Sequence, residues 1–236
     1  MIEKIGIICA GDQELDPLLK ELEVSGVVEK AMLKFYEGKL CGFELVVLFC
    51  GACKVNAAIA SQILIDTFNV KKIINAGTAG GMDQRLKIFD TVISTEVAYH
   101  DVEKGILTEF HPWMKSVYFE ADKKMLKAAK EAAAKIHTKG KIYFGRMVTG
   151  EAFITDDGRK QIIDEFNPLS VDMESASIAH VCYVNKIPFI AIRTITDTAE
   201  HSGSAAFEEN LKESSIITKE VTKALLQEIY FHFPIS

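Results

Sequence analysis

Four apolar runs of this sequence are followed by residues that could form a reactive site. Three of the runs precede a carboxylate that could do acid or base chemistry, namely Glu14, Glu174 and Asp197, and one precedes the glycine-rich segment 78–81. Each carboxylate alone fits a structural role, as a first-turn helix acid or a turn former. In open α/β sheets, however, ligands bind beyond the carboxyl ends of strands, so we expect three carboxylates and a tight glycine-rich turn to converge. Asp172 lies beside Glu174, and we expect it to be a supporting, structural residue.

Strands and helices that must position these groups alternate along the chain. Apolar runs rich in Ile and Val predict strands, and apolar residues at helical spacing predict helices. The expected strands are 4–10, the arms of a hairpin within 31–50, 71–77, 91–100, 141–150 and 187–196. The expected helices are 12–23, 55–68, 121–137 and 204–231. The predicted fold is α/β, a three-layer sandwich whose central mixed, largely parallel sheet is flanked by helices.

Composition limits the domain count and the partners. The chain has 236 residues, of which 48% are hydrophobic, and no polar linker divides it, so residues 1–236 are expected to form a single domain. The net charge is −6 and only four arginines occur, without a lysine or arginine cluster. A nucleic-acid partner is therefore not expected.

The apolar run at the N-terminus is too short for a signal peptide. No window approaches the roughly eighteen apolar residues that a membrane span needs. We therefore expect a cytoplasmic protein without a membrane partner. The five cysteines are an odd number scattered through apolar runs, which favours reduced thiols over a disulfide framework.

Cys50 and Cys53 form a C-x-x-C pattern between a predicted strand and a predicted helix. Thioredoxin-like proteins place a redox pair at such a junction, so a redox function is an alternative interpretation. The pattern is short, and the chain has no other redox feature. A zinc site is not expected, because there is no second C-x-x-C or H-x₃-H to complete four ligands.

Several longer motifs together resemble one known family. The segments GIICAGDQEL, INAGTAGG, AYHD, TGEAFI, VDMESASIAHVC and IRTITDTAE resemble the bacterial 5′-methylthioadenosine/S-adenosylhomocysteine nucleosidases of the nucleoside phosphorylase superfamily. The resemblance covers nearly the whole chain. It implies one phosphorylase-like domain, a homodimer in which each subunit lends a loop to its partner's pocket, and no metal or organic cofactor. It also implies hydrolysis of the N-glycosidic bond of both nucleosides, to adenine and a 5′-thioribose. Whether the pathway served is methionine salvage or signal synthesis is left open.

Hydrolysis of a purine N-glycosidic bond needs an acid for the departing base and a base for the attacking water. By the resemblance, Asp197 would protonate adenine N7, with Thr196 as the neighbouring hydroxyl that orients it. Glu14 would activate the water, which Thr78 and Arg193 would help to hold.

The ribose and the purine need further contacts. By the same resemblance, Glu174 would bind the ribose hydroxyls, and Met173 would lie under the sugar. Phe153 would stack on the purine, the backbone of Ile154 would contact its Watson–Crick edge, and Phe207 would close over the 5′ substituent. The remaining residues expected to contact substrate are Ala79 and Gly80.

Two positions depart from the family pattern. Gly11 and Ala52 stand where relatives carry larger apolar residues at the 5′ end of the site. A roomier 5′ pocket is expected, unless His111, Pro112 or Trp113 fills it from a neighbouring subunit. The preferred 5′ substituent is therefore open.

Two other functions compete with hydrolysis. A phosphate-dependent purine nucleoside phosphorylase would need cationic groups over the glycine-rich segment, and Arg85 and Arg193 are the only candidates near strand ends. The Glu14 carboxylate would repel phosphate and suits water. A non-catalytic nucleoside-binding relative would be expected to lack the acid or the base, and both are present.

Overall fold

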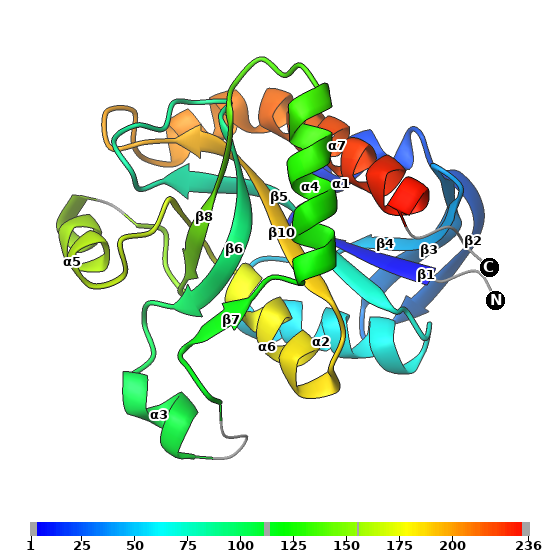
Figure 1. Cartoon of the computed structure of the whole chain (residues 1–236), viewed down its shortest axis with the longest axis horizontal. Helices are drawn as coiled ribbons and strands as arrows, with labels where there is room; N and C mark the ends of the chain where they lie inside the picture. The colour runs from blue at the N-terminus through cyan, green and yellow to red at the C-terminus, as the bar shows by residue number, and fades with distance from the viewer. Residues whose placement is uncertain (1–3, 111–113, 155, 233–236) are drawn as a thin grey trace.

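One mixed sheet forms the centre of the molecule (Figure 1). The computed structural model describes residues 4–110, 114–154 and 156–232. The strands are β1 (Lys4–Cys9), β2 (Glu23–Lys30), β3 (Leu33–Leu40), β4 (Phe43–Phe49), β5 (Lys72–Gly81), β6 (Thr91–Tyr99), β7 (Tyr118–Glu120), β8 (Ile142–Thr149), β9 (Ser170–Asp172) and β10 (Phe189–Asp197). The helices are α1 (Asp12–Leu19), α2 (Lys54–Asp66), α3 (Lys104–Glu109), α4 (Lys123–Lys135), α5 (Asp156–Phe166), α6 (Ser175–Asn185) and α7 (Ser204–His232).

The strand order within the described residues is β10-β6-β8-β9-β5-β1-β4-β3-β2, and β7 pairs with β6. Parallel pairings join β4, β1, β5 and β10 in turn, whereas β2, β3 and β4 form an antiparallel edge. Because β10 pairs with both β5 and β6, the strands β5, β10, β6, β8 and β9 close into a ring. All nine residues of β10 are buried, as the near-continuous apolar run predicted.

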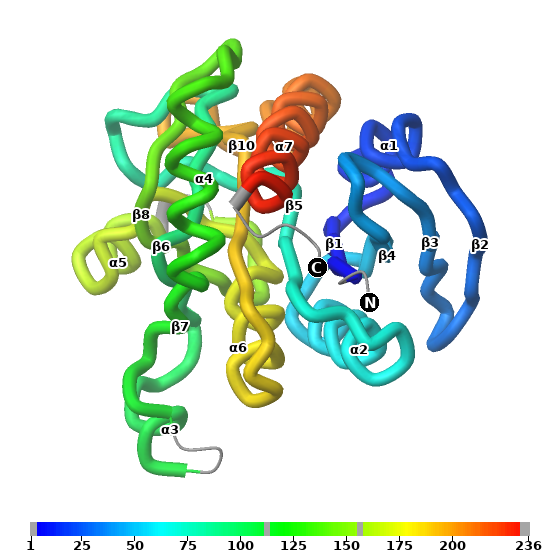
Figure 2. The backbone as a smooth tube through the Cα atoms, turned by 45° about the vertical axis from the view of Figure 1, so that its right-hand side comes forward, coloured from blue at the N-terminus to red at the C-terminus, as the bar shows by residue number. Residues whose placement is uncertain are grey.

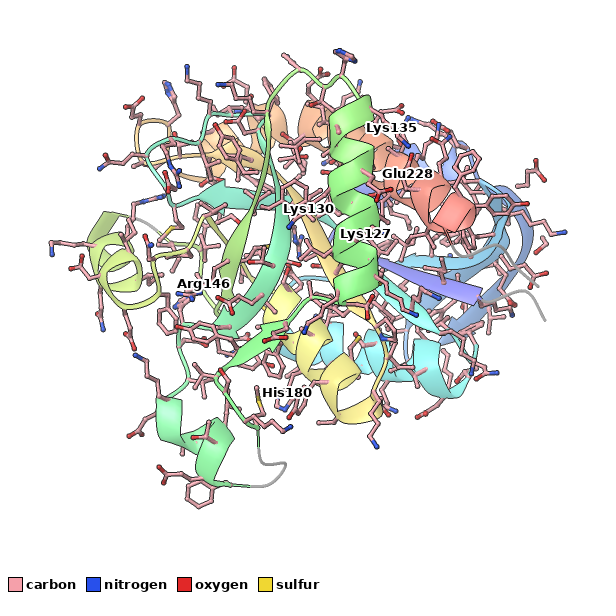
Figure 3. The ribbon with its side chains drawn as sticks, viewed as in Figure 1. Lys127, Lys130, Lys135, Arg146, His180 and Glu228 are labelled. Atoms are coloured by element: carbon pink, nitrogen blue, oxygen red, sulfur yellow. The ribbon has the colours of Figure 1, made fainter. Side chains whose placement is uncertain are left out.

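Helices cover both faces of the sheet, which confirms the predicted α/β class. Apolar residues of α2 and α6 pack in one core, and those of α1, α4 and α7 pack in a second core. Figure 2 shows α2 and α6 side by side, with α4 and α7 on the other side of the strands. Lys135 of α4 reaches Glu228 of α7 at 2.7 Å, tying these two helices together (Figure 3). None of the described helices is long and apolar enough to cross a membrane.

The structure contains α3, α5 and β7, which were not predicted, and it differs from the sequence-based prediction at three further places. Strand β2 was not predicted, because nearly all of its residues are exposed and leave no alternating apolar pattern. The helix expected over 12–23 ends at Leu19, because Glu23 already begins β2. Residues 78–81 form the end of β5 and not a tight turn, because β10 and β9 supply ladder partners up to Gly81.

Candidate active site

A cavity of about 530 Å³ lies at the carboxyl ends of β1, β5, β9 and β10. Every site residue proposed from the sequence lines it. They are Glu14, Thr78, Ala79, Gly80, Phe153, Ile154, Met173, Glu174, Arg193, Thr196, Asp197 and Phe207. Residues that sequence reasoning did not single out also line it, namely Ala10, Asp12, Gln13, Ala152, Val171, Ser204, Glu208 and Leu211. Most of them adjoin a predicted site residue along the chain or lie one helical turn from Phe207. This closeness in sequence is the signal that could have identified them.

Glu14 is held by four hydrogen bonds near the start of α1. Its Oε2 accepts from the backbone N–H groups of Ala10 (2.7 Å) and Gly11 (3.1 Å). Its Oε1 accepts from the backbone N–H (2.7 Å) and the hydroxyl (2.8 Å) of Thr78. The side chain is buried, and these four hydrogen bonds fix its position.

Arg193 is the fully buried centre of the site. Its Nε lies 3.0 Å from Asp172 Oδ2, its Nη2 lies 3.1 Å from Glu174 Oε2, and its Nη1 lies 3.9 Å from Glu14 Oε1. Nη1 also donates to the carbonyl of Thr78 at 3.2 Å. Burial lowers the pKa of this guanidinium, but the three carboxylates outweigh burial and raise the pKa of Arg193. One permanent cation thus holds three acids.

Glu174 occupies the N-cap position of α6, where the chain leaves β9. Its Oε1 accepts from the backbone N–H of Cys53 at 3.1 Å, and its Oε2 accepts from Arg193. Burial raises the pKa of Glu174 to about 7, with Asp172 and Glu14 acting in the same direction and Arg193 opposing them. Each oxygen keeps a lone pair for a ligand.

Asp172 supports this arrangement and faces the cavity only in part. Its Oδ1 accepts from the Thr149 hydroxyl (2.6 Å) and from the backbone N–H groups of Glu174 (3.1 Å) and Ser175 (3.0 Å). Its Oδ2 accepts from the Ser175 hydroxyl and pairs with Arg193. These bonds account for an acid inside an apolar segment, because they join the start of α6 to Arg193.

Asp197 ends β10 and is 2% exposed. Its Oδ1 accepts from the Thr196 hydroxyl at 2.9 Å, and that hydroxyl also contacts the carbonyl of Ala79 at 3.3 Å. Gly80 lies beside it on β5, where a Cβ atom would come 3.1 Å from Asp197 Oδ2. Burial raises the pKa of Asp197, and the Thr196 hydrogen bond opposes that rise. Such a carboxyl group retains its proton at higher pH than an exposed aspartate does.

Two aromatic rings also border the cavity. Phe153 follows β8, and Phe207 lies in the first turn of α7. Their ring centroids are 6.3 Å apart at an interplanar angle of 80°. Phe153 is 44% exposed, so its face is free to stack on a planar ligand. Ile154 and Met173 add further apolar side chains to the cavity lining.

The position of Gly11 leaves space at the cavity wall. No heavy atom lies within 4 Å of the point where a Cβ of Gly11 would stand, and Ala52 lines the same cavity. The predicted loop residues 111–113 fall outside the described residues, so their relation to this space stays a prediction.

All five cysteines are free thiols. Burial raises the pKa of Cys50 to about 12, and burial together with the Glu151 carboxylate raises the pKa of Cys53. Redox-active pairs need the opposite shift, because the thiolate is the reactive form. Among the described residues, no group of His, Cys, Asp or Glu side chains is arranged to hold a metal ion.

Comparisons with known proteins identify the family of this chain. The phosphorylase superfamily model matches residues 4–227. A 5′-methylthioadenosine/S-adenosylhomocysteine nucleosidase from Exiguobacterium sp. is 36% identical over 234 residues, which cover 96% of this chain and 98% of that protein.

Solved structures are similar over almost the full length. The nucleosidase of that name from Neisseria meningitidis, in complex with methylthio-immucillin-A, has a TM-score of 0.87 at 30% identity and covers 96% of this chain and 99% of its own. Futalosine hydrolase of Helicobacter pylori strain 26695 has a TM-score of 0.87 at 26% identity, covering 97% of this chain and 99% of its own. The chain belongs to the 5′-methylthioadenosine/S-adenosylhomocysteine nucleosidase family of the phosphorylase superfamily.

Proposed function

We propose that this protein, acting as one domain over residues 1–236, hydrolyses the N-glycosidic bond of 5′-methylthioadenosine and S-adenosylhomocysteine. The products are adenine and the corresponding 5′-thioribose. The observation that carries the proposal is the meeting of Glu14, Glu174 and Asp197 in one cavity beside an exposed aromatic face, Phe153. The names of the relatives support the substrate class.

Asp197 is the acid in this mechanism. A departing purine leaves as a neutral base when it receives a proton at N7, so the acid must be protonated when substrate binds. Burial at the end of β10 raises the pKa of Asp197 and so favours that state. The Thr196 hydroxyl occupies Oδ1, which leaves Oδ2 as the oxygen that faces the base.

Glu14 and Thr78 bind and activate the attacking water. The four donors around Glu14 hold its carboxyl group in place, and the Thr78 hydroxyl that donates to it has lone pairs left for a water proton. Water bound to the Thr78 hydroxyl attacks the sugar carbon of the N-glycosidic bond and gives up its proton to Glu14, either directly or by way of that hydroxyl. The negative charge beside the sugar also stabilises the oxocarbenium-like transition state.

Glu174 holds the ribose. It needs partners for its remaining lone pairs once water leaves the cavity, and vicinal sugar hydroxyls can supply them. Arg193 and the Cys53 N–H fix its orientation, so the ribose is bound in one position. Met173 beside it contributes an apolar surface for the sugar.

The charges in the cavity favour water over phosphate as the nucleophile. Among the described residues that line the cavity, Arg193 is the one cation. Its donors already face Asp172, Glu174 and Thr78, and the Glu14 carboxylate lies 3.9 Å from its Nη1. A phosphate dianion would meet excess negative charge there. A phosphorylase is therefore the weaker candidate.

The 5′ substituent lies near Gly11 in this proposal. The open space beside Gly11 and the small side chain of Ala52 leave room for the homocysteine chain as well as for a methylthio group. We therefore propose both nucleosides as substrates, with use in methionine salvage in the cytoplasm.

A homodimer is part of the proposal. Val55 and Ile59 of α2 and Tyr183 and Val184 of α6 form an exposed apolar patch on two adjacent helices, with Val55 68% exposed. Such a patch suits a self-complementary interface. Helix α3, which carries an exposed Ile106, extends away from the body in Figures 1 and 2 and is positioned to reach a second subunit. Light scattering should give twice the chain mass, and a monomer at micromolar concentration would contradict the interface.

Adenine release from each nucleoside, with and without phosphate, tests the function. We expect release without phosphate, and we expect Asp197→Asn to lose turnover while still binding the nucleoside. Release only with phosphate would indicate a phosphorylase. Full activity of Asp197→Asn would remove Asp197 as the acid, and binding without turnover by the unaltered chain would indicate a non-catalytic nucleoside-binding protein.

A further inference from the structure

Arg159 on α5 is a buried cation without a paired carboxylate in the described structure. The side chain is 6% exposed. Its Nη1 donates to the backbone carbonyl of Gly81 and contacts the sulfur of Met82, whereas its Nε and Nη2 have no acceptor among the described residues. Burying an unpaired charge is costly, so a group of this kind calls for a specific reason.

The carbonyl that holds Arg159 belongs to the strand beside Asp197. Asp197 lies opposite Gly80 in the β5–β10 pairing, and Gly81 is the next residue of β5. A Cβ atom at Gly81 would stand 3.4 Å from the backbone oxygen of Asp197, and one at Gly80 would stand 3.1 Å from its Oδ2. Arg159 therefore binds the strand segment that flanks Asp197, and it does not line the substrate cavity.

The other charged groups around Asp197 line the substrate cavity. They include Glu208 of α7, Glu14, Glu174 and Arg193. Arg193 is already committed to the three acids, and the remaining side chains are negative.

On α5 itself, the described cation next to Arg159 is the exposed Lys160, which pairs with Asp164 at 2.6 Å. Arg159 is therefore the positive charge within the described residues that is free to act on Asp197.

We propose that Arg159 is a positioning residue for Asp197: its guanidinium is the countercharge for the carboxylate that forms when the Asp197 proton moves to the departing base. This inference rests on the proposed function, in which Asp197 is the acid.

The chemistry needs such a charge. Before the bond breaks, Asp197 is neutral in an apolar environment, and afterwards the same oxygen carries a negative charge that water does not reach. A fixed guanidinium nearby stabilises that developing charge without any reorganisation. Burial raises the pKa of Asp197, while Arg159 acts against that rise, so the acid holds its proton yet releases it to the base.

The test is the pH dependence of kcat/KM for adenine release from methylthioadenosine. Loss of the Asp197 proton produces the alkaline limb of that profile. In Arg159→Met, we expect the limb to move to higher pH by on the order of one unit, because an adjacent guanidinium lowers a carboxyl pKa by about that amount or more. A tenfold lower kcat should accompany it, since one pKa unit is about a tenfold change in the proton equilibrium.

Matched variants separate charge from packing. Arg159→Lys keeps the cation and should restore the position of the limb, and Lys160→Met removes a cation from the exposed face of the same helix and should leave the profile unchanged. If Arg159→Met does not fold, Arg159→Gln replaces it. A limb that stays in place in a folded neutral variant, or moves equally in Arg159→Lys, would overturn the inference. Asp197→Asn distinguishes failure of this inference from failure of the proposed function, because full activity of that variant would refute Asp197 as the acid whatever the Arg159 variants show.

Discussion

Replacing Gly77 with alanine is predicted to disable the site without changing any group that contacts substrate. Gly77 lies on β5 opposite Arg193. A Cβ there would stand 2.5 Å from Arg193 Nη1 and 2.7 and 2.8 Å from the two oxygens of Glu14. The single methyl group would thus occupy the space in which the buried cation meets the proposed base.

The magnitude follows from these distances. Ordinary contacts of a Cβ atom lie at 3.4–4 Å. The guanidinium and the carboxylate must therefore retreat by about 1 Å, and a displacement of that size in a catalytic group costs on the order of a hundredfold in rate. Arg193 is fully buried and paired with Asp172 and Glu174, so an extra methyl that displaces it should also destabilise the fold by about 1–3 kcal/mol.

The assay compares kcat/KM for adenine release and the melting temperature of Gly77→Ala with those of Gly26→Ala. Gly26 is on β2, where nothing lies within 4 Å of an added Cβ, so the control makes the same chemical change away from the site. We expect a loss of about two orders of magnitude in Gly77→Ala and almost none in Gly26→Ala. Unchanged kcat/KM and melting temperature in Gly77→Ala would refute the close packing of Glu14 and Arg193.

Three further predictions concern the same residues. The free energy of unfolding should fall as pH rises from the unfolded pKa of Glu174 toward its folded value of about 7, because the folded state holds the proton more tightly. Glu174→Gln should remove up to about 3 kcal/mol of this loss, measured by denaturant titrations at several pH values. The same pH dependence of the unfolding free energy in wild type and Glu174→Gln would contradict it. Asp172→Asn should lower kcat/KM at least about tenfold, because Arg193 loses one partner and α6 loses a charged cap; kinetics equal to wild type would show that Asp172 is dispensable. Burial raises the pKa of the Cys50 thiol to about 12, three units above its ordinary value, so Cys50 should react with iodoacetamide about a thousandfold more slowly in the folded than in the unfolded protein. Mass spectrometry would report the labelling, and rapid labelling of the folded protein would reopen the redox interpretation.

The sequence was sufficient for the parts of the fold that depend on local pattern. The all-buried run of β10 and the amphipathic α4 have strong periodic signals, and both form where predicted. Strand β2 has no such signal, because it is an exposed edge strand. The extension of β5 through its glycines depends on strand partners that are distant in sequence, in β9 and β10, and no local pattern encodes those partners.

The candidate site shows the same division. The acids could be found because each follows an apolar run, and the structure brings all three to one cavity. The donors that hold them could not be found, since the Cys53 N–H that binds Glu174 lies 121 residues away in sequence. Arg159 was likewise missed, because an arginine within a charged helix looks solvent-exposed until its burial against Gly81 is known.

In the proposed reaction, water activated beside Glu14 is the nucleophile. Turnover of methylthioadenosine in heavy-oxygen water with excess phosphate present, followed by mass spectrometry of the sugar, tests this directly. We expect free 5′-methylthioribose that carries one heavy oxygen, and no sugar phosphate. A sugar 1-phosphate without solvent oxygen would contradict it and would identify the cavity as that of a phosphorylase.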